Sequence, residues 1–359
     1  MISSSFSLST NTKTRFIVFV PIELSQGYGN IMNGLLAAHL LGVEFQRTVC
    51  LTSSMSSFLT AFEAIDPTAV RECPRLLQNL PPSTYENSVS LVNFYPPPNE
   101  CIVKDTLANR KLPVIYLKAN TYPRWPSIPQ KDFFFRFYRP RSSFLQKLPY
   151  NPSQPPQTVV HLRLADGSQD PRAGLDEATF QALGALLPRN TTWLVTNHVP
   201  WFDYFAQHYG WQHPQWHKVT HSAGLDTQNW GERRHRKSSH HKLSNDGTKQ
   251  QELQVWMDWF TVLRAKTVYH THSDFSISAI HWQDIQDSKS ISGVASKNGN
   301  NGGSLSQQPH TLQLLEESWR RDGETEPLIE RTKRASGRRQ LRLCSSPSGQ
   351  LLGPLYVTP

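Results

Sequence analysis

The chain alternates short apolar runs with longer segments in which apolar residues recur at helical spacing. The run RFIVFV at residues 15–20 is rich in β-branched and aromatic residues, which predicts a buried strand. Residues 30–42, NIMNGLLAAHLLG, are apolar on nearly every side and predict a buried helix with Asn30 as its N-cap and Gly42 as its C-terminal stop. The run TVCLT at 48–52 predicts the strand that completes a βαβ unit.

The second half of the chain repeats this alternation more regularly. Apolar runs that predict strands and amphipathic segments that predict helices follow in the order strand 158–165, helix 175–187, strand 191–197, helix 199–210, helix 252–265, strand 266–272 and a helix from 275. This order predicts a parallel sheet covered by helices on both faces, and ligands bind such sheets beyond the carboxyl ends of the strands. The sequence therefore predicts an α/β protein, and its 359 residues are enough for two domains.

Composition divides the chain into parts. Prolines gather in residues 66–157, which cannot form long regular elements, and Ser, Gly and Asn dominate a stretch beyond residue 284. The predicted parts are a disordered N-terminus (1–14), an N-terminal domain (15–150), a linker (151–157), a C-terminal domain (158–284) with a polar insertion (222–250), and a disordered, low-complexity, basic tail (285–359).

The formal charge of +9 is concentrated in two polar runs, residues 232–242 and 331–342. Such runs are usually solvated and disordered, and the alternative is a surface for nucleic acid or another polyanion, since basic runs bind phosphates without reading a sequence. No stretch approaches the roughly 20 apolar residues of a transmembrane helix. The sequence as given thus predicts a soluble chain.

The four cysteines, at positions 50, 73, 101 and 344, show no CxxC pair or other metal-ligand spacing, so no metal site is predicted. Cys73 and Cys101 either bridge a loop in an oxidising lumen or are free thiols. The redox compartment stays open on this pattern.

The strand at 158–165 carries two cationic groups, His161 and Arg163, and Asp166 follows them. Side chains alternate along a strand, so His161 and Arg163 lie on the same face near its carboxyl end. An Arg guanidinium removed from water requires a negative partner. Two partners are open: Asp166 in an internal ion pair, or the phosphate of a ligand, which the planar guanidinium contacts through paired donors.

Two turns that lead into helices carry glycine and hydroxyl residues. Gly27, Gly29 and Asn30 open the first helix, where free backbone N–H groups and the helix dipole attract an anion; the alternative is an ordinary tight turn. Ser273 and Ser276 open the last helix, where hydroxyl donors and the helix dipole suit a diphosphate, although N-capping alone needs only one of them.

Together these motifs resemble the GDP-fucose-dependent fucosyltransferases, the superfamily that includes α1,2-, core α1,6- and protein O-fucosyltransferases. The resemblance rests on G-x-G-N at the first helix, H-x-R-x-x-D at 161–166 and S-x-F-S at 273–276. It covers residues 15–60 and 157–283. It implies a GT-B fold, in which two Rossmann-like domains with parallel sheets face each other across a cleft.

The resemblance also implies a role for each matched residue. Arg163 would bind the β-phosphate and stabilise the charge of departing GDP, because that charge develops in the transition state. His161 and Asp258 would contact the guanosine, although Asp258 lies opposite the apolar stripe of its helix, which favours a solvated face. The diphosphate and base pocket would be lined by Ser273, Phe275 and Ser276, and the first domain would present Gly29 and Asn30 to the cleft.

Inverting transfer needs a general base for the acceptor hydroxyl, and the carboxylates near Arg163 are Asp166 and Asp170. With GDP held by Arg163 and helix dipoles, no divalent metal or other cofactor is expected. Leu164 replaces a second basic residue of the family, and a Thr-Asn pair at 196–197 replaces an acidic turn. An inactive relative that only binds therefore stays an alternative.

The expected function is transfer of fucose from GDP-fucose to a hydroxyl of a glycan or protein. The alternatives are transfer from another nucleotide sugar and a non-catalytic polyanion or nucleic-acid binder that acts through the basic runs. The expected partners are a nucleotide-sugar donor and a glycan or protein acceptor, with no specific nucleic acid. The expected location is the Golgi or ER lumen if an anchor lies upstream, and otherwise the cytoplasm.

Overall fold

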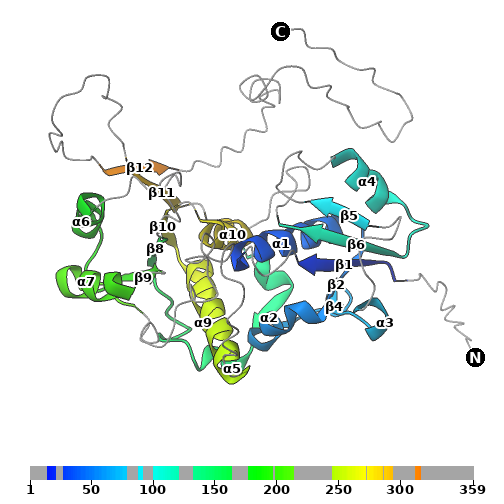
Figure 1. Cartoon of the computed structure of the whole chain (residues 1–359), viewed down its shortest axis with the longest axis horizontal. Helices are drawn as coiled ribbons and strands as arrows, with labels where there is room; N and C mark the ends of the chain where they lie inside the picture. The colour runs from blue at the N-terminus through cyan, green and yellow to red at the C-terminus, as the bar shows by residue number, and fades with distance from the viewer. Residues whose placement is uncertain are drawn as a thin grey trace, which may run out of the picture.

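A computed structural model of the chain describes residues 14–21, 27–78, 88–91, 100–120, 132–163, 177–196, 199–213, 245–271, 273–285, 287–293 and 312–316. All structural statements below concern these residues. Within them the chain forms two five-stranded sheets and one two-stranded sheet (Figure 1).

The N-terminal half builds the first sheet, in which all four strand pairs are parallel and the strand order is β4-β2-β1-β6-β5. Its central strand is the apolar run that the sequence marks as a buried strand. The elements are β1 (Phe16–Pro21), α1 (Tyr28–Glu44), β2 (Thr48–Leu51), η2 (Ser53–Met55), α2 (Ser56–Ala61), β3 (Phe62–Ala64), β4 (Val70–Glu72), α3 (Arg75–Gln78), β5 (Ser88–Leu91), α4 (Glu100–Ala108), β6 (Val114–Ala119), η4 (Phe134–Arg136), β7 (Tyr138–Pro140) and α5 (Ser142–Leu145).

The C-terminal half builds the second sheet, with strand order β12-β11-β10-β8-β9 and every pair parallel except β11 with β12. Its elements are β8 (Thr158–Leu162), α6 (Glu177–Leu186), β9 (Thr192–Thr196), α7 (Val199–Tyr209), α9 (Asn245–Arg264), β10 (Thr267–His270), α10 (Asp274–Gln283), β11 (Asp287–Gly293) and β12 (Leu312–Glu316). The predicted α/β class with two parallel sheets is confirmed.

The start of α1 differs from its prediction. The N-cap is Gly27, whose φ of 80° lies in the left-handed region that glycine adopts without strain, so the helix begins at Tyr28 and Asn30 lies in its first turn. Gly42 lies inside the helix rather than after it. A Cβ there would lie 3.0 Å from the carbonyl oxygen of Arg47, so this glycine permits close packing at the turn into β2.

The C-terminal region also departs from its prediction. Residues 287–293 and 312–316 form β11 and β12, so the prediction of disorder for 285–359 is wrong for these two segments. The sequence of β11 is mostly polar, so its side chains do not predict a strand, but pairing with β10 on one side and β12 on the other supplies its main-chain hydrogen bonds. Helix α9 begins at Asn245, inside the predicted polar insertion 222–250.

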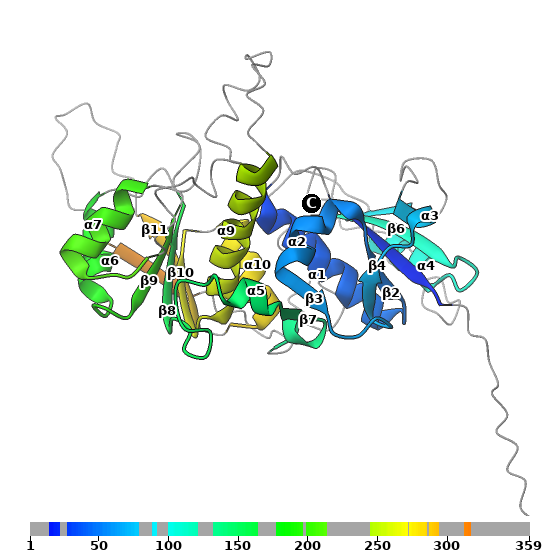
Figure 2. The same ribbon diagram turned by 90° about the horizontal axis from the view of Figure 1, so that it is seen from below.

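One aromatic core joins the two halves. Helices α9 and α10 lie between the sheets and pack against the helices and short strands of the N-terminal half (Figure 2). Trp282 donates from Nε1 to the carbonyl of Met32 at 2.9 Å, across the boundary between the halves. The largest fully buried rings in this core are Phe19, Phe58, Phe62, Phe134, Tyr138 and Phe144 from the N-terminal half and Trp256, Trp259 and Trp282 from α9 and α10.

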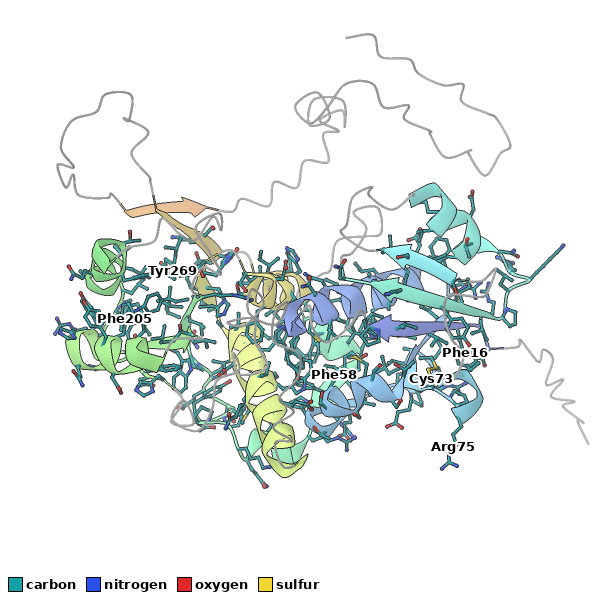
Figure 3. All side chains as sticks on the ribbon, in the orientation of Figure 1. Phe16, Phe58, Cys73, Arg75, Phe205 and Tyr269 are labelled. Atoms are coloured by element: carbon teal, nitrogen blue, oxygen red, sulfur yellow. A yellow bond between two sulfur atoms is a disulfide. The ribbon has the colours of Figure 1, made fainter. Side chains whose placement is uncertain are left out.

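A second, smaller core covers the far face of the second sheet. Helices α6 and α7 pack there, with Phe205 of α7 and Tyr269 of β10 in one cluster (Figure 3). This face of the sheet lies away from the N-terminal half (Figure 1). The second sheet is thus covered on both faces, as strands buried on both sides require.

A disulfide joins Cys50 of β2 to Cys73, which follows β4 (Figure 3). The two strands are neighbours in the first sheet, and their Cα atoms are 4.9 Å apart at the bridge. The alternative pairing of Cys73 with Cys101 is therefore wrong. Both cysteines are buried in a small cluster with Val18 and Tyr116.

None of the helices in the described residues is long and apolar enough to cross a membrane. The division into domains at 151–157 stays a prediction, because one core continues across the two halves.

Candidate functional site

The carboxyl ends of the central strands mark the places where each sheet can hold a ligand. In the first sheet β1 lies between β2 and β6, and in the second sheet β8 lies between β9 and β10. The chain leaves each central strand toward one side and later returns on the other, which creates a topological switch point. Helix α1 follows β1, and α10 follows β10, so both helices begin at these switch points.

The N-terminus of α10 presents a buried hydroxyl. Ser273 is the N-cap residue, with extended backbone and an exposed fraction of 3 %. Its Oγ has no hydrogen-bond partner among the described residues, although its carbonyl accepts from Ile277 N at 2.9 Å. A buried hydroxyl without a partner costs about 1–3 kcal/mol, so this position is suited to a ligand that supplies an acceptor.

His161 lies at the end of β8 and contacts the first turn of α10. Its Nδ1 is 3.1 Å from Ser276 Oγ, and Ser276 Oγ donates to the carbonyl of Ser273 at 3.0 Å. The single hydroxyl hydrogen of Ser276 is used there, so the Ser276 oxygen is left to accept from Nδ1 of His161. The ring also lies against Phe275, with centroids 5.3 Å apart. Four predicted residues are thus brought together.

Arg163 directly follows β8 and is half-buried. Its backbone N–H donates to Thr271 Oγ1 at 2.8 Å, and Thr271 N donates to the carbonyl of His161 at 3.2 Å. Thr271, fully buried, therefore ties the end of β10 to the end of β8. Arg163 and the N-terminus of α10 therefore lie at the same edge of the second sheet.

The first turns of α1 and α10 are in direct contact. A Cβ on Gly29 would lie 2.3 Å from the backbone of Asp274 and Phe275, so only glycine permits this approach. Further along, His39 of α1 packs against Trp282 near the end of α10, with centroids 5.5 Å apart. The two helices therefore run in the same direction, with their N-termini side by side.

This arrangement places two positive helix ends at one point. Each helix N-terminus carries about half an elementary positive charge, and the N–H groups of a first turn have no partner within their own helix. Asp274, exposed in the first turn of α10, supplies one negative charge nearby. A diphosphate would match the paired helix ends, the Ser273 hydroxyl and the cation of Arg163.

Asp258 of α9 is buried, which contradicts the solvated face that its helical position favours. Its exposed fraction is 6 %, because α9 packs on both sides, and burial raises the pKa of its carboxyl to about 8. Gln254 precedes it by four residues and so lies on the same helix face. Asp258 Oδ1 and Gln254 Oε1 have no hydrogen-bond partner among the described residues, so α9 offers two acceptors to a ligand with N–H donors.

The remaining predicted residues fall into two groups, those outside the described residues and those at the start of α1. Asp166, Asp170 and Asn197 fall outside the described residues. Gly27 and Asn30 lie at the start of α1, and a Cβ on Gly27 would meet only open space. Within the described ranges, no group of three His, Cys, Asp or Glu side chains could hold a metal ion.

Sequence reasoning did not single out Thr271 or Gln254. Thr271 lies beside His161, and the sign of its role in the sequence was its position at the carboxyl end of a predicted strand. Gln254 stands one helical turn before Asp258, and that spacing was the available signal. Neither residue type is distinctive without the fold, so only the structure identifies them.

The fold is similar to that of solved fucosyltransferases, while no protein-family model and no curated protein matches the chain. Fucosyltransferase NodZ from Bradyrhizobium is 15 % identical over 78 % of this chain and 96 % of its own, with a TM-score of 0.43. Arabidopsis thaliana FUT1 in complex with GDP is 10 % identical over 79 % and 71 %, with a TM-score of 0.49. POFUT1 in complex with GDP-fucose is 12 % identical over 77 % and 96 %, with a TM-score of 0.38.

Proposed function

We propose that this chain is an inverting glycosyltransferase that moves fucose from GDP-fucose to a hydroxyl of a glycan or protein. The observation that carries the proposal is the meeting of two helix N-termini, those of α1 and α10, beside the unpartnered hydroxyl of Ser273. GDP-fucose is the ligand of the POFUT1 structure described above. The order of motifs in the sequence supports its assignment here.

In the proposed complex the diphosphate lies at the first turn of α10. Ser273 donates from Oγ, the backbone N–H groups donate along the helix axis, and Arg163 supplies a planar guanidinium with several N–H donors. These groups stabilise the negative charge that develops on GDP as the glycosidic bond breaks. This set performs the task that a divalent metal performs elsewhere, so transfer is proposed to proceed without one.

The base is proposed to lie against α9. Guanine presents N1–H and N2–H donors on one edge, and the carboxylate of Asp258 accepts both. Gln254 offers a further acceptor one turn away. Uracil and cytosine do not present this pair of donors, so Asp258 supports selection of GDP over UDP and CDP.

The acceptor hydroxyl must lose its proton as it attacks the sugar carbon. Asp166 and Asp170 follow Arg163 in the chain and are proposed as the alternative general bases. Variants of each to Asn, assayed for transfer, would assign the role to the one whose loss abolishes turnover but leaves GDP affinity unchanged.

Titration calorimetry of the full chain with GDP, UDP and CDP tests the donor site. We expect GDP to bind with micromolar affinity, and Arg163→Ala and Ser273→Ala to weaken it. Arg189→Ala is the matched control, because Arg189 is an exposed arginine of the same half of the chain. Equal binding of the three nucleotides would point to another nucleotide sugar, and no binding would remove the proposal.

Turnover is tested with GDP-fucose labelled in the sugar. Release of free fucose reports transfer to water, and this reaction needs no knowledge of the acceptor. We expect it to persist in EDTA and to fall in Arg163→Ala. Inhibition by EDTA that added Mg²⁺ or Mn²⁺ reverses would contradict the metal-free proposal.

The location is proposed to be the Golgi or ER lumen, with protein or glycan fucosylation as the process. The buried disulfide between Cys50 and Cys73 supports an oxidising compartment, since such bridges are rare in the cytosol. A mass spectrum of the peptides from cell-derived protein, taken without reductant, would show the linked pair. Free thiols at both positions would favour the cytoplasm.

A further inference from the structure

Three elements meet beside the anion site that is proposed at the N-terminus of α10. Tyr28 opens α1, Ser57 lies in the first turn of α2, and Glu252 lies in the N-terminal part of α9. All three side chains are partly exposed, whereas Trp256 beneath them is 1 % exposed. The three side chains, called the Glu252 cluster below, therefore form a surface with a rigid floor.

A chain of hydrogen bonds fixes the carboxylate in this cluster. Trp256 Nε1 donates to Ser57 Oγ at 3.4 Å, and the Ser57 hydroxyl donates to Glu252. The ring of Tyr28 meets that of Trp256 edge to face, with centroids 4.9 Å apart. Partial burial raises the pKa of Glu252, while the bond from Ser57 lowers it. Glu252 is thus held in place with acceptor capacity left over.

The cluster lies next to the anion site rather than within it. Tyr28 is the neighbour of Gly29, whose backbone lies against the first turn of α10. The Cα atoms of consecutive residues are about 3.8 Å apart, so Tyr28 lies directly beside the residue that borders the proposed anion site. The exposed hydroxyl residues Ser53 and Ser54, after β2, extend the same carboxyl edge of the first sheet.

An aromatic ring, hydroxyl groups and a fixed carboxylate are the groups that bind sugars. The carboxylate accepts hydrogen bonds from sugar hydroxyls, and the ring covers the apolar face of the sugar. A fixed negative charge also repels carboxylates and sulfates on acidic glycans. These properties favour a neutral, hydroxyl-rich ligand.

We propose that the Glu252 cluster is the acceptor subsite and that it binds a neutral saccharide; this proposal rests on the proposed function. Glu252 contacts the acceptor, and Ser57 is a positioning residue that orients the carboxylate. The subsite belongs to both halves of the chain, because Tyr28 and Ser57 come from the first half and Glu252 from the second.

A printed glycan array, probed with labelled full-length protein in saturating GDP, tests the subsite. We expect binding to neutral glycans and none to sialylated or sulfated forms of the same structures. Glu252→Gln keeps the size of the side chain but removes its charge, and we expect it to weaken binding of neutral glycans by at least about tenfold and to admit acidic ones. The matched control is Glu44→Gln, an exposed carboxylate at the far end of α1.

The outcomes separate the two proposals. Failure of the wild-type protein to bind GDP would remove the proposed function. If GDP binds but no neutral glycan does, or if Glu252→Gln keeps both the affinity and the preference for neutral glycans, the acceptor subsite is wrong. Loss of GDP affinity together with glycan binding in Glu252→Gln would also overturn it, because the cluster would then only support the fold.

Discussion

Two buried titratable residues lack the water that would normally solvate them. Asp258 of α9 has a pKa raised to about 8 by burial, and His39 of α1 has a pKa lowered to about 3 by burial. His39 Nε2 lies 2.7 Å from the hydroxyl of Tyr138, so the neutral ring has one partner. The two residues have different proposed roles, because Asp258 is proposed to contact the nucleotide base whereas His39 lies in the shared core.

Binding of GDP is expected to release a proton from Asp258. At pH 7 the free carboxyl is mostly protonated, because its pKa is about 8, and the N–H donors of guanine favour the ionised form. Calorimetry in two buffers with different ionisation enthalpies measures the number of protons released. Asp258→Asn should bind GDP more weakly and abolish the part of the release due to this residue. An unchanged buffer dependence in the variant would contradict the assignment.

The stability of the ligand-free protein is expected to depend on pH through the same two residues. Native His39 binds fewer protons than unfolded His between pH 3 and 6.5, so its contribution rises with pH there and is lost as pH falls. Native Asp258 binds more protons than unfolded Asp between pH 3.8 and about 8, so its contribution falls as pH rises. Each slope is at most about 1.4 kcal/mol per pH unit.

Urea unfolding at a series of pH values separates these contributions. As pH rises from 6.5 to 8, the free energy of unfolding of Asp258→Asn should fall less steeply than that of wild type. As pH falls from 6.5 to 4, the free energy of unfolding of His39→Gln should fall less steeply than that of wild type. The difference between each variant and wild type isolates one residue, because all other groups titrate in both proteins. Parallel pH curves for wild type and either variant would show that the residue titrates normally.

At the scale of elements, the contact between α1 and α10 determines the site. The two helices come from different sheets, yet their first turns touch at Gly29 and their later turns meet at Trp282. A shift of either helix would separate Ser273 from the start of α1. The proposed anion site therefore depends on the pair of helices and not on either helix alone.

Gly29→Ala is expected to disrupt this pair. The added Cβ would lie 2.3 Å from the backbone of Asp274 and Phe275, and neither backbone can rotate away. We expect a loss of stability of about 1–3 kcal/mol or more and a loss of GDP affinity. Gly42→Ala is the matched control, because its added Cβ would lie 3.0 Å from the carbonyl oxygen of Arg47 at the far end of the same helix, so it should lower stability but keep GDP affinity. Thermal unfolding and GDP titration of both variants provide the measurement.

The elements were predictable where their residues carry a strong local pattern. Strands β1, β2, β8, β9 and β10 are apolar and rich in β-branched or aromatic residues, and all but β9 lie in the centre of a sheet or beside it. Strand β11 is not of this kind, since DSKSISG owes its conformation to pairing with β10 and not to its own preference. Strands with polar sequences cannot be recognised from a local pattern alone.

The candidate site was predictable in its composition but not in its geometry. The sequence indicates His161, Arg163 and the Ser273 turn, because small polar residues follow apolar strands. The burial of Asp258 could not be inferred, because a helix between two sheets buries faces that periodicity assigns to solvent. The role of Gly29 depends on a contact with residues 274–275, far along the chain, which no local pattern contains.

At the scale of the whole molecule, the aromatic core makes the two halves one folding unit. Phe58 and Phe134 of the first half contact Trp256 and Trp282 of the second, with centroids 5.4 Å and 5.5 Å apart. Helix α9 packs against β8 of its own sheet and against α2 of the first half. The halves are thus distinct in topology but joined in their core.

Unfolding is therefore expected to occur in a single transition. Circular dichroism at far- and near-ultraviolet wavelengths should give the same midpoint in urea, because the tryptophan environments and the sheets are lost together. Trp282→Ala should lower the free energy of unfolding by about 3–5 kcal/mol and therefore lower the urea midpoint of both signals together. Two separated transitions in the wild-type protein would show that each half folds on its own.

The shared core also limits how the molecule can admit its substrates. A hinge motion that parted the halves would expose several of these rings, and two rings of about 150–250 Å² each, at about 25 cal/mol per Å², already amount to roughly 10 kcal/mol. That is as large as the total stability of a typical domain. The nucleotide would then enter a preformed site, and its association rate would depend on diffusion and salt concentration rather than on domain closure.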